Sequence, residues 1–161
     1  MSCVCLIDTC VLLNLLNVPG RNQQMAEVTA DYLQYVDLGA TLIMPMATMM
    51  ETGNHIAQNG NGTKRRETAA RFCDMVRASF TEDNPPWQPS EFPSIQEVTT
   101  WLDRFPDLAG QNKSPTRTGE GTSFGDLSII AEYEKCCRRF AMSEVFIWSL
   151  DSDLACYHHR P

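Results

Sequence analysis

Short apolar runs alternate along the chain with longer segments whose apolar residues recur at helical spacing. The runs suited to buried strands span 3–7, 40–44 and 145–150. Helical spacing or capping signals mark 11–16, 22–38, 47–58, 63–80, 94–105, 123–139 and a short helix from Asp153. Strands that alternate with helices require crossovers. The pattern therefore predicts an α/β fold, a three-layer α/β/α domain with a central, mainly parallel sheet.

The middle of the chain follows this pattern less well. Four prolines fall in 81–93, and 106–122 is polar and rich in Gly, Thr and Asn. We expect one domain over 1–161 with an irregular insertion at about 79–121, and a third strand near Phe80 and Thr81. Local signals predict Thr63, Ser94 and Ser123 as helix N-caps and Gly39 as a helix C-cap.

Four acidic residues occupy related places in this pattern. Asp8 and Asp151 directly follow apolar strands, Glu51 lies in the helix after the second strand, and Asp126 lies in the first turn of a helix. In a parallel sheet all four can meet at one edge. Carboxylates ~4 Å apart repel by about 4 kcal/mol per pair at an effective dielectric of about 20, so such a cluster needs protons or a cation. Oxygen ligands suit Mg²⁺ or Mn²⁺, which can activate water and clamp a phosphodiester.

Each acid also has a purely structural explanation. Asp8 and either Asp151 or Asp153 can cap the helices that follow them. Asp126 lies three residues after Ser123, where an acid completes a capping pair, and Glu51 can pair with His55 one turn on. Pattern alone leaves the metal site and the capping roles both open.

The net charge of -7 argues against indiscriminate nucleic-acid binding but does not exclude a nucleic-acid enzyme. The basic residues cluster, and phosphates could be held away from a metal by Lys64, Arg65 and Arg66, together with Lys113 and Arg117. The alternative for each of them is a solvated surface.

Seven cysteines, an odd number, lie mostly within apolar stretches, which favours buried reduced thiols over disulfides. The alternative is a zinc site built from Cys136, Cys137, Cys156, His158 and His159. The sequence shows no basic region followed by an apolar region of the kind found in signal peptides, and no apolar run approaches the ~20 residues that span a bilayer. We therefore expect a cytoplasmic protein that does not bind membranes.

Four segments resemble, in order, the four motifs of PIN-domain ribonucleases, a family in which many small bacterial members are toxins of toxin–antitoxin pairs. They are LIDTCVLL at 6–13, METG at 50–53, SFGDLSIIA at 123–131 and IWSLDSD at 147–153. The resemblance spans nearly the whole chain.

The resemblance implies a central parallel sheet and Mg²⁺- or Mn²⁺-dependent endonuclease activity on RNA. The family's acidic quartet matches Asp8, Glu51, Asp126 and Asp151, and a fifth, accessory acid matches Asp153. Hydroxyls beside the site match Thr9 and Ser149, where they can bond a carboxylate or a metal-bound water. The implied partners are an RNA substrate, an antitoxin protein and a second copy of the chain in a homodimer.

The stretch from about 79 to 121 departs from the compact members of the family. It can cover a groove, bind a partner or replace the antitoxin surface, and Glu120 within it can reach the site. A catalytically silent RNA- or protein-binding module is the main alternative function. A phosphotransferase or phosphatase with Asp8 as nucleophile is a third, but such enzymes typically want a second Asp where this chain has Cys10.

Overall fold

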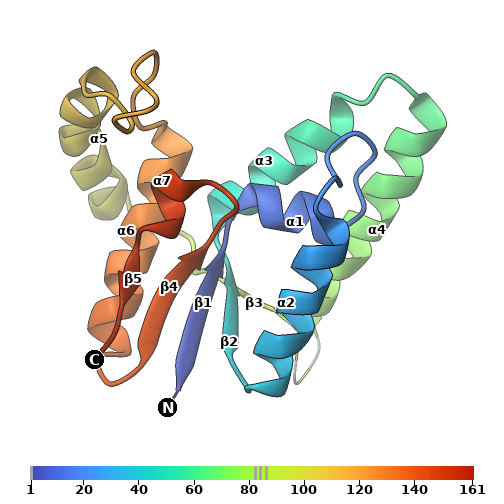
Figure 1. Ribbon diagram of the computed structural model, residues 1–161, viewed down its shortest axis with the longest axis horizontal. Coiled ribbons are helices and arrows are strands. Elements are labelled where there is room, and N and C mark those ends of the chain that lie inside the picture. Colours follow the sequence, from blue (N-terminus) through green and yellow to red (C-terminus); the bar gives the residue numbers. More distant parts are fainter. Residues whose placement is uncertain (1, 82, 84, 86) are drawn as a thin grey trace.

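The computed structural model describes residues 2–81, 83, 85 and 87–161, and its described part is an α/β fold around one mixed, mostly parallel sheet (Figure 1). The strands are β1 (Cys3–Ile7), β2 (Thr41–Met44), β3 (Gln88–Pro89), β4 (Glu144–Trp148) and β5 (His158–His159). The helices are α1 (Thr9–Leu15), α2 (Met25–Asp37), α3 (Met46–Ala57), α4 (Gly62–Thr81), α5 (Ile95–Gly110), α6 (Phe124–Arg139) and α7 (Ser152–Ala155). The α/β prediction with a mainly parallel sheet is confirmed.

The strand order is β3-β2-β1-β4-β5, in which only β5 runs antiparallel to its neighbour. Successive side chains of a strand point to opposite faces, so each strand contributes to two cores. Cys5 and Ile7 pack in one core with Val28 of α2 and Val76 of α4. The other core includes Val4, Leu6, Val145 and Ile147, with Ile129 of α6. Helices on both faces are compatible with a three-layer arrangement.

The parallel register brings the carboxyl ends of the central strands to one edge of the sheet. Ile7 of β1 pairs with Trp148 of β4, and Leu6 pairs with Ile43 of β2. The next residue after β1, Asp8, donates its backbone N–H to the carbonyl of Trp148 at 3.0 Å. The segments that follow β1 and β4 therefore begin side by side, at the edge from which α1 and α7 start (Figure 1).

Two of the three predicted N-caps are confirmed, and the glycine predicted as the C-cap of α2 lies one residue beyond the actual cap, Leu38. Ser94 and Glu97 form a reciprocal capping box at α5, and Ser123 accepts from the N–H of Asp126 at the start of α6. Gly39 follows α2 with φ of +66°, a left-handed conformation that glycine adopts without strain. Thr63 is wrong as a cap, because α4 already begins at Gly62 and the side chain of Asn61 accepts from the N–H of Lys64.

The prediction of a third strand near Phe80 and Thr81 is wrong. Both residues end α4, whose helical register continues through the buried Val76 and Ser79, and the Phe80 side chain is exposed. The third parallel strand is β3, two residues long and within the stretch predicted as a proline-rich loop. Residues 82, 84 and 86 of that loop lie outside the described residues.

The stretch at 79–121 is less irregular than predicted. Helix α5 continues to Gly110, past Pro106, where a loop was expected. It packs on α6 through Phe105 and Phe124, whose ring centroids lie 5.2 Å apart, and through a bidentate pair between Arg104 and Glu134. Among the described residues of this stretch, 90–94 and most of 111–121 lack regular structure. In the part of the chain that the structure describes, no helix has the length and apolar character needed to cross a membrane.

The core makes a simple prediction about stability. Leu6 is fully buried between β2 and β4, whereas Leu38 after α2 is 65% exposed. Leu6→Ala should lower the free energy of unfolding by ~2–5 kcal/mol, since it leaves a cavity, and Leu38→Ala should change it by less than ~0.5 kcal/mol. Urea denaturation measures both. Equal effects would contradict the assignment of Leu6 to the core.

Candidate active site at the carboxyl edge of the sheet

Asp8 is held in one orientation by three donors. Its Oδ1 accepts from the N–H of Thr9 at 2.7 Å, so it does cap α1. Its Oδ2 accepts from the hydroxyl of Ser149 at 2.7 Å and from the thiol of Cys10 at 3.1 Å. Burial, followed by the nearby charge of Asp8, raises the pKa of Cys10 to about 12. Cys10 therefore stays a neutral donor to Asp8 at physiological pH.

Glu51 reaches the same neighbourhood from α3. Its Oε2 accepts from the hydroxyl of Thr9 at 2.8 Å, rather than from His55. The start of α6 comes very near, because a Cβ built on Gly125 would lie 2.7 Å from Oε1 of Glu51. A side chain at position 125 would thus push Glu51 away, and glycine permits the close approach.

Asp126 turns its carboxylate toward a lysine. Its Oδ2 lies 2.8 Å from Nζ of Lys113, and both side chains are 13% exposed. The helix cap here is Ser123, which leaves the Asp126 carboxylate free of that role. Burial alone would lower the pKa of Lys113, but the hydrogen bond to Asp126 and the charges of Asp126 and Asp151 raise it overall. Lys113 is therefore a stable cation among these acids.

Asp151 and Asp153 share an arginine. The Nη1 atom of Arg117 lies 2.7 Å from Oδ2 of Asp151 and 3.4 Å from Oδ2 of Asp153. Asp151 also caps α7, and its N–H donates to the hydroxyl of Ser149 at 3.0 Å. The Asp153 side chain is only 5% exposed, and its Oδ2 has no hydrogen-bond partner among the described residues. The charge of Asp151 above all raises the pKa of Arg117.

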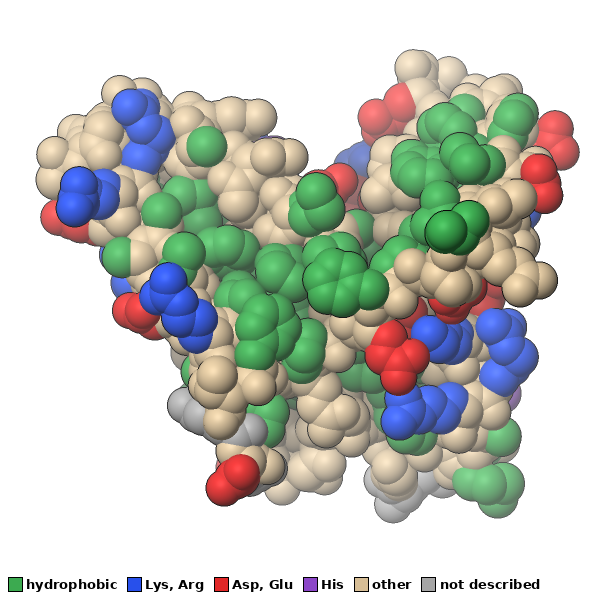
Figure 2. Space-filling view, turned by 180° about the vertical axis from the view of Figure 1, so that it is seen from behind, with side chains coloured by type: hydrophobic (Ala, Val, Ile, Leu, Met, Phe, Trp, Pro, Cys, Tyr) green, Lys and Arg blue, Asp and Glu red, His purple; other side chains and the backbone are tan. Residues whose placement is uncertain are grey.

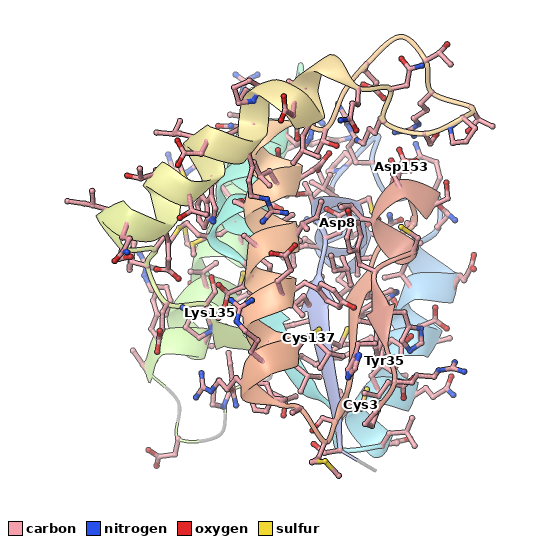
Figure 3. The ribbon with its side chains drawn as sticks, turned by 90° about the vertical axis from the view of Figure 1, so that its left-hand side faces the viewer. Cys3, Asp8, Tyr35, Lys135, Cys137 and Asp153 are labelled. Carbon is pink, nitrogen blue, oxygen red and sulfur yellow. The ribbon has the colours of Figure 1, made fainter. Side chains whose placement is uncertain are left out.

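These contacts link five carboxylates, which we call the acid ring: Asp8, Glu51, Asp126, Asp151 and Asp153. The hydroxyl of Ser149 donates to the Asp8 carboxylate and accepts from the backbone N–H of Asp151. Thr9 donates its backbone N–H to Asp8 and its hydroxyl to Glu51. Glu51 borders the residue before Asp126, and the charges of both Asp126 and Asp151 act on Lys113. Figure 3 shows Asp8 and Asp153 at the same end of the sheet. The four acids of the motifs therefore surround one neighbourhood.

The acid ring is not a preformed metal centre. Within residues 2–81, 83, 85 and 87–161, no three His, Cys, Asp or Glu side chains lie together as ligands for one ion. Asp126 and Asp151 instead contact Lys113 and Arg117. The donors present are carboxylate and hydroxyl oxygens, which match the chemistry of Mg²⁺ or Mn²⁺ in kind.

The predicted basic residues divide into two groups. Lys113 and Arg117 were expected away from the acids, and that placement is wrong, because both contact them directly. Lys64, Arg65 and Arg66 lie in the first turns of α4, and in the described structure none of them forms an ion pair with the acid ring. Arg65 instead donates to the carbonyl of Asn59. Glu120 lies at the border of the site, 3.4 Å from Arg117.

The alternative zinc site finds no support in the described part of the chain. Cys136 is buried in a core, Cys156 is exposed, and Nε2 of His158 lies 2.6 Å from Glu144 rather than from a thiol. No metal-ligand group forms there among described residues. The cysteines are free thiols, but the expectation that they are buried holds for Cys5 and Cys136 alone, since Cys73 and Cys156 are exposed and the other three are partly exposed.

Two residues of the site were not singled out from the sequence. Cys10 was noted only as the position where phosphotransferases with an aspartyl nucleophile typically have a second Asp, yet it donates to Asp8 and accepts from the N–H of Leu150. Gly125 lies between the cap Ser123 and Asp126 in the motif. A glycine at this place, in the first turn of a helix, was the signal in the sequence for a close approach by another residue. Both act by setting the position of an acid.

Two hollows flank the acid ring. One, of about 270 Å³, includes Glu51 and Gly125 and continues between α3 and α6. The other, of about 280 Å³, includes Arg117, Asp151 and Asn14. An extended ligand that passes the acids can thus contact protein on both sides.

Comparisons of this chain with protein-family models, with curated proteins and with solved structures find no match.

The protonation state of the Cys10 thiol can be tested by alkylation. A thiol with a pKa near 12 carries almost no thiolate at pH 8, whereas the exposed Cys73 is accessible. Iodoacetamide at pH 8 should modify Cys73 rapidly and leave Cys10 unmodified in the folded protein. Peptide mass spectrometry over a time course measures both. Modification of Cys10 at the rate of Cys73 would contradict its role as a protonated donor.

Proposed function

We propose that this protein is a metal-dependent endoribonuclease of the PIN type, which hydrolyses RNA phosphodiester bonds with Mg²⁺ or Mn²⁺. The observation that carries the proposal is the acid ring, which gathers carboxylates from four separate segments at the carboxyl edge of a mostly parallel sheet. Helix capping explains single acids but gives no reason for all of them to converge. The four segments are also those that resemble the PIN motifs.

Charge balance supports a cation in this site. Among the described residues, Lys113 and Arg117 are the cations that form ion pairs with the five carboxylates, so with every group ionised three negative charges remain uncompensated. Carboxylates gathered at one edge of a sheet repel one another unless protons or cations intervene. Asp8, Glu51, Asp126 and Asp151 would hold the metal, with Asp153 as an accessory acid. When bound, the metal would supply an activated water and charge stabilisation at the scissile phosphate.

The other residues of the site position these acids. Ser149 and Cys10 fix Oδ2 of Asp8, and Thr9 fixes Glu51. With a metal as counter-ion to the acids, Lys113 and Arg117 would be free to bind the phosphate oxygens of the RNA. Lys64, Arg65 and Arg66 bind phosphates farther along the strand.

We also infer the toxin role within a toxin–antitoxin pair, acting in the cytoplasm, with an antitoxin and a second copy of the chain as protein partners. Support comes from α5, which has no fully buried residue and leaves apolar side chains in solvent. Ile95 is 88% exposed and Leu102 is 55% exposed, and Phe92 just before the helix is 80% exposed. Such a surface suits a protein partner.

A catalytically silent RNA- or protein-binding module is the second candidate. The contacts of Lys113 and Arg117 with Asp126 and Asp151 favour it, since they neutralise two acids without a metal. Metal binding separates the two candidates, because only the nuclease requires it.

Removal of one acid tests the chemistry. Asp8→Asn should reduce Mn²⁺-dependent cleavage of structured RNA more than ~100-fold, since even changes to groups behind a metal ligand cost 10–100-fold. Asp37→Asn is the matched control, because Asp37 is exposed at the end of α2. Gel analysis of cleavage with Mn²⁺ and with EDTA measures the effect. Cleavage that persists in EDTA, or that Asp8→Asn leaves intact, would refute the nuclease proposal.

Removal of a competing cation tests the metal site. Lys113→Ala and Arg117→Ala should each tighten Mn²⁺ binding about tenfold, because a positive charge near the acids opposes the ion. Lys64→Ala is the control and should leave the affinity unchanged. Isothermal titration calorimetry measures these affinities without any need for activity. The absence of Mn²⁺ binding in the parent protein and in both variants would favour the silent module.

A further inference from the structure

The hollow beside Glu51 has an apolar lining and acidic ends. Its walls include Met50 of α3, Pro93 of the segment before α5, and the rings of Trp101 and Phe124. Glu51 of the acid ring lines one part of it, and Glu132 of α6 lines another. Figure 2 shows apolar side chains gathered in the hollow on this face of the molecule.

Glu132 is the unusual residue of this pocket. It is half-buried, and burial raises the pKa of its carboxyl group. The neighbouring acids have partners, since Lys135 bridges Glu91 and Glu97 and Arg104 pairs with Glu134. Glu132 makes no hydrogen bond or ion pair with any side chain that the structure describes. Because this carboxyl group still contacts water, an occupant that covers it must donate hydrogen bonds in place of that water.

The pocket adjoins the acid ring. Glu51 belongs to both, and Gly125, the residue before Asp126, also lines the pocket. Glu132 lies farther along the same helix, α6. A phosphate at the acid ring therefore has its base beside the pocket.

We propose that this pocket binds a nucleobase of the RNA substrate, one that presents an amino group to the Glu132 carboxylate, and that it excludes uracil. The inference rests on the proposed function and adds base selectivity to it. The flat rings of Trp101 and Phe124 offer faces for stacking, as in other single-strand binding sites. A carboxylate accepts from the amino group of cytosine or adenine, whereas the carbonyl oxygens of uracil face it with like charge.

Other occupants fit the pocket less well. A phosphate is repelled by Glu51, Glu91 and Glu132, which all line it. An apolar peptide side chain would cover Glu132 without giving it a donor, and the carboxyl group would lose its contact with water. A base combines an apolar face with donors on its edge, and this is the chemistry that the lining requires.

Binding to short single-stranded oligomers tests the pocket without cleavage. The probes are fluorescently labelled oligo(C), oligo(A) and oligo(U), titrated in Mn²⁺ with protein that carries Asp8→Asn and followed by fluorescence anisotropy. Oligo(C) and oligo(A) should bind about tenfold more tightly than oligo(U), because one good edge contact discriminates by roughly that factor.

Four variants in the same background assign the effect. Glu132→Leu should abolish the difference between oligo(C) and oligo(U), and Trp101→Ala should weaken binding of every oligomer roughly tenfold through lost stacking. Glu27→Leu is the matched control, because Glu27 is exposed on α2, and it should change neither quantity. Glu132→Gln keeps the shape of the side chain and removes the charge, so loss of selectivity in this variant does not reflect unfolding.

The outcomes separate this proposal from the nuclease proposal. Equal binding of all three oligomers, no binding, or binding that does not depend on Glu132 and Trp101 would overturn the pocket proposal. Asp8-dependent cleavage without base preference would leave the nuclease standing and the pocket refuted. Base-selective binding without cleavage would retain the pocket and refute the nuclease.

Discussion

Repulsion among carboxylates at one edge of the sheet is the constraint on which the site depends. Each acid of the ring is held by a hydrogen bond or a cation, and the hydroxyls of Thr9 and Ser149 connect segments more than 40 residues apart. Lys113 and Arg117 place positive charge directly beside Asp126 and Asp151. The fold thus keeps mutually repelling carboxylates together, because each of them contacts a hydrogen-bond donor or a cation.

Much of this arrangement follows from local sequence. An apolar run that ends in Asp8 and another that ends before Asp151 predict strands whose ends meet, because crossover connections make neighbouring strands parallel. The capping box at Ser94 and the cap at Ser123 fix the starts of α5 and α6 from side chains close in sequence. These features depend on spacing within a few residues, and they were predicted correctly.

The features that were missed depend on contacts between distant segments. Strand β3 has two residues, too few for a periodic pattern, and it exists because Ile43 and Met44 offer a free edge. Pro106 ends a helix by local rules, but α5 passes through it with the support of its packing on α6. No local signal places Lys113 beside Asp126, since both positions depend on the path of the intervening loop.

Helix α5 connects the two functional parts of the site. Trp101, a wall of the apolar pocket, stacks edge-on against Phe124 of α6, and the carbonyl of Leu108 accepts from the N–H of Thr122 at the end of the loop that carries Lys113 and Arg117. A shift of α5 that follows occupation of the pocket would therefore move the loop and its two cations. On the proposed functions Lys113 and Arg117 would compete with a metal for Asp126 and Asp151, so a base in the pocket would be coupled through α5 to the charge at the acid ring. The long segment between α4 and α6 would then have a role in the site itself, because a strand bound in the pocket would change the charges that its own phosphate meets.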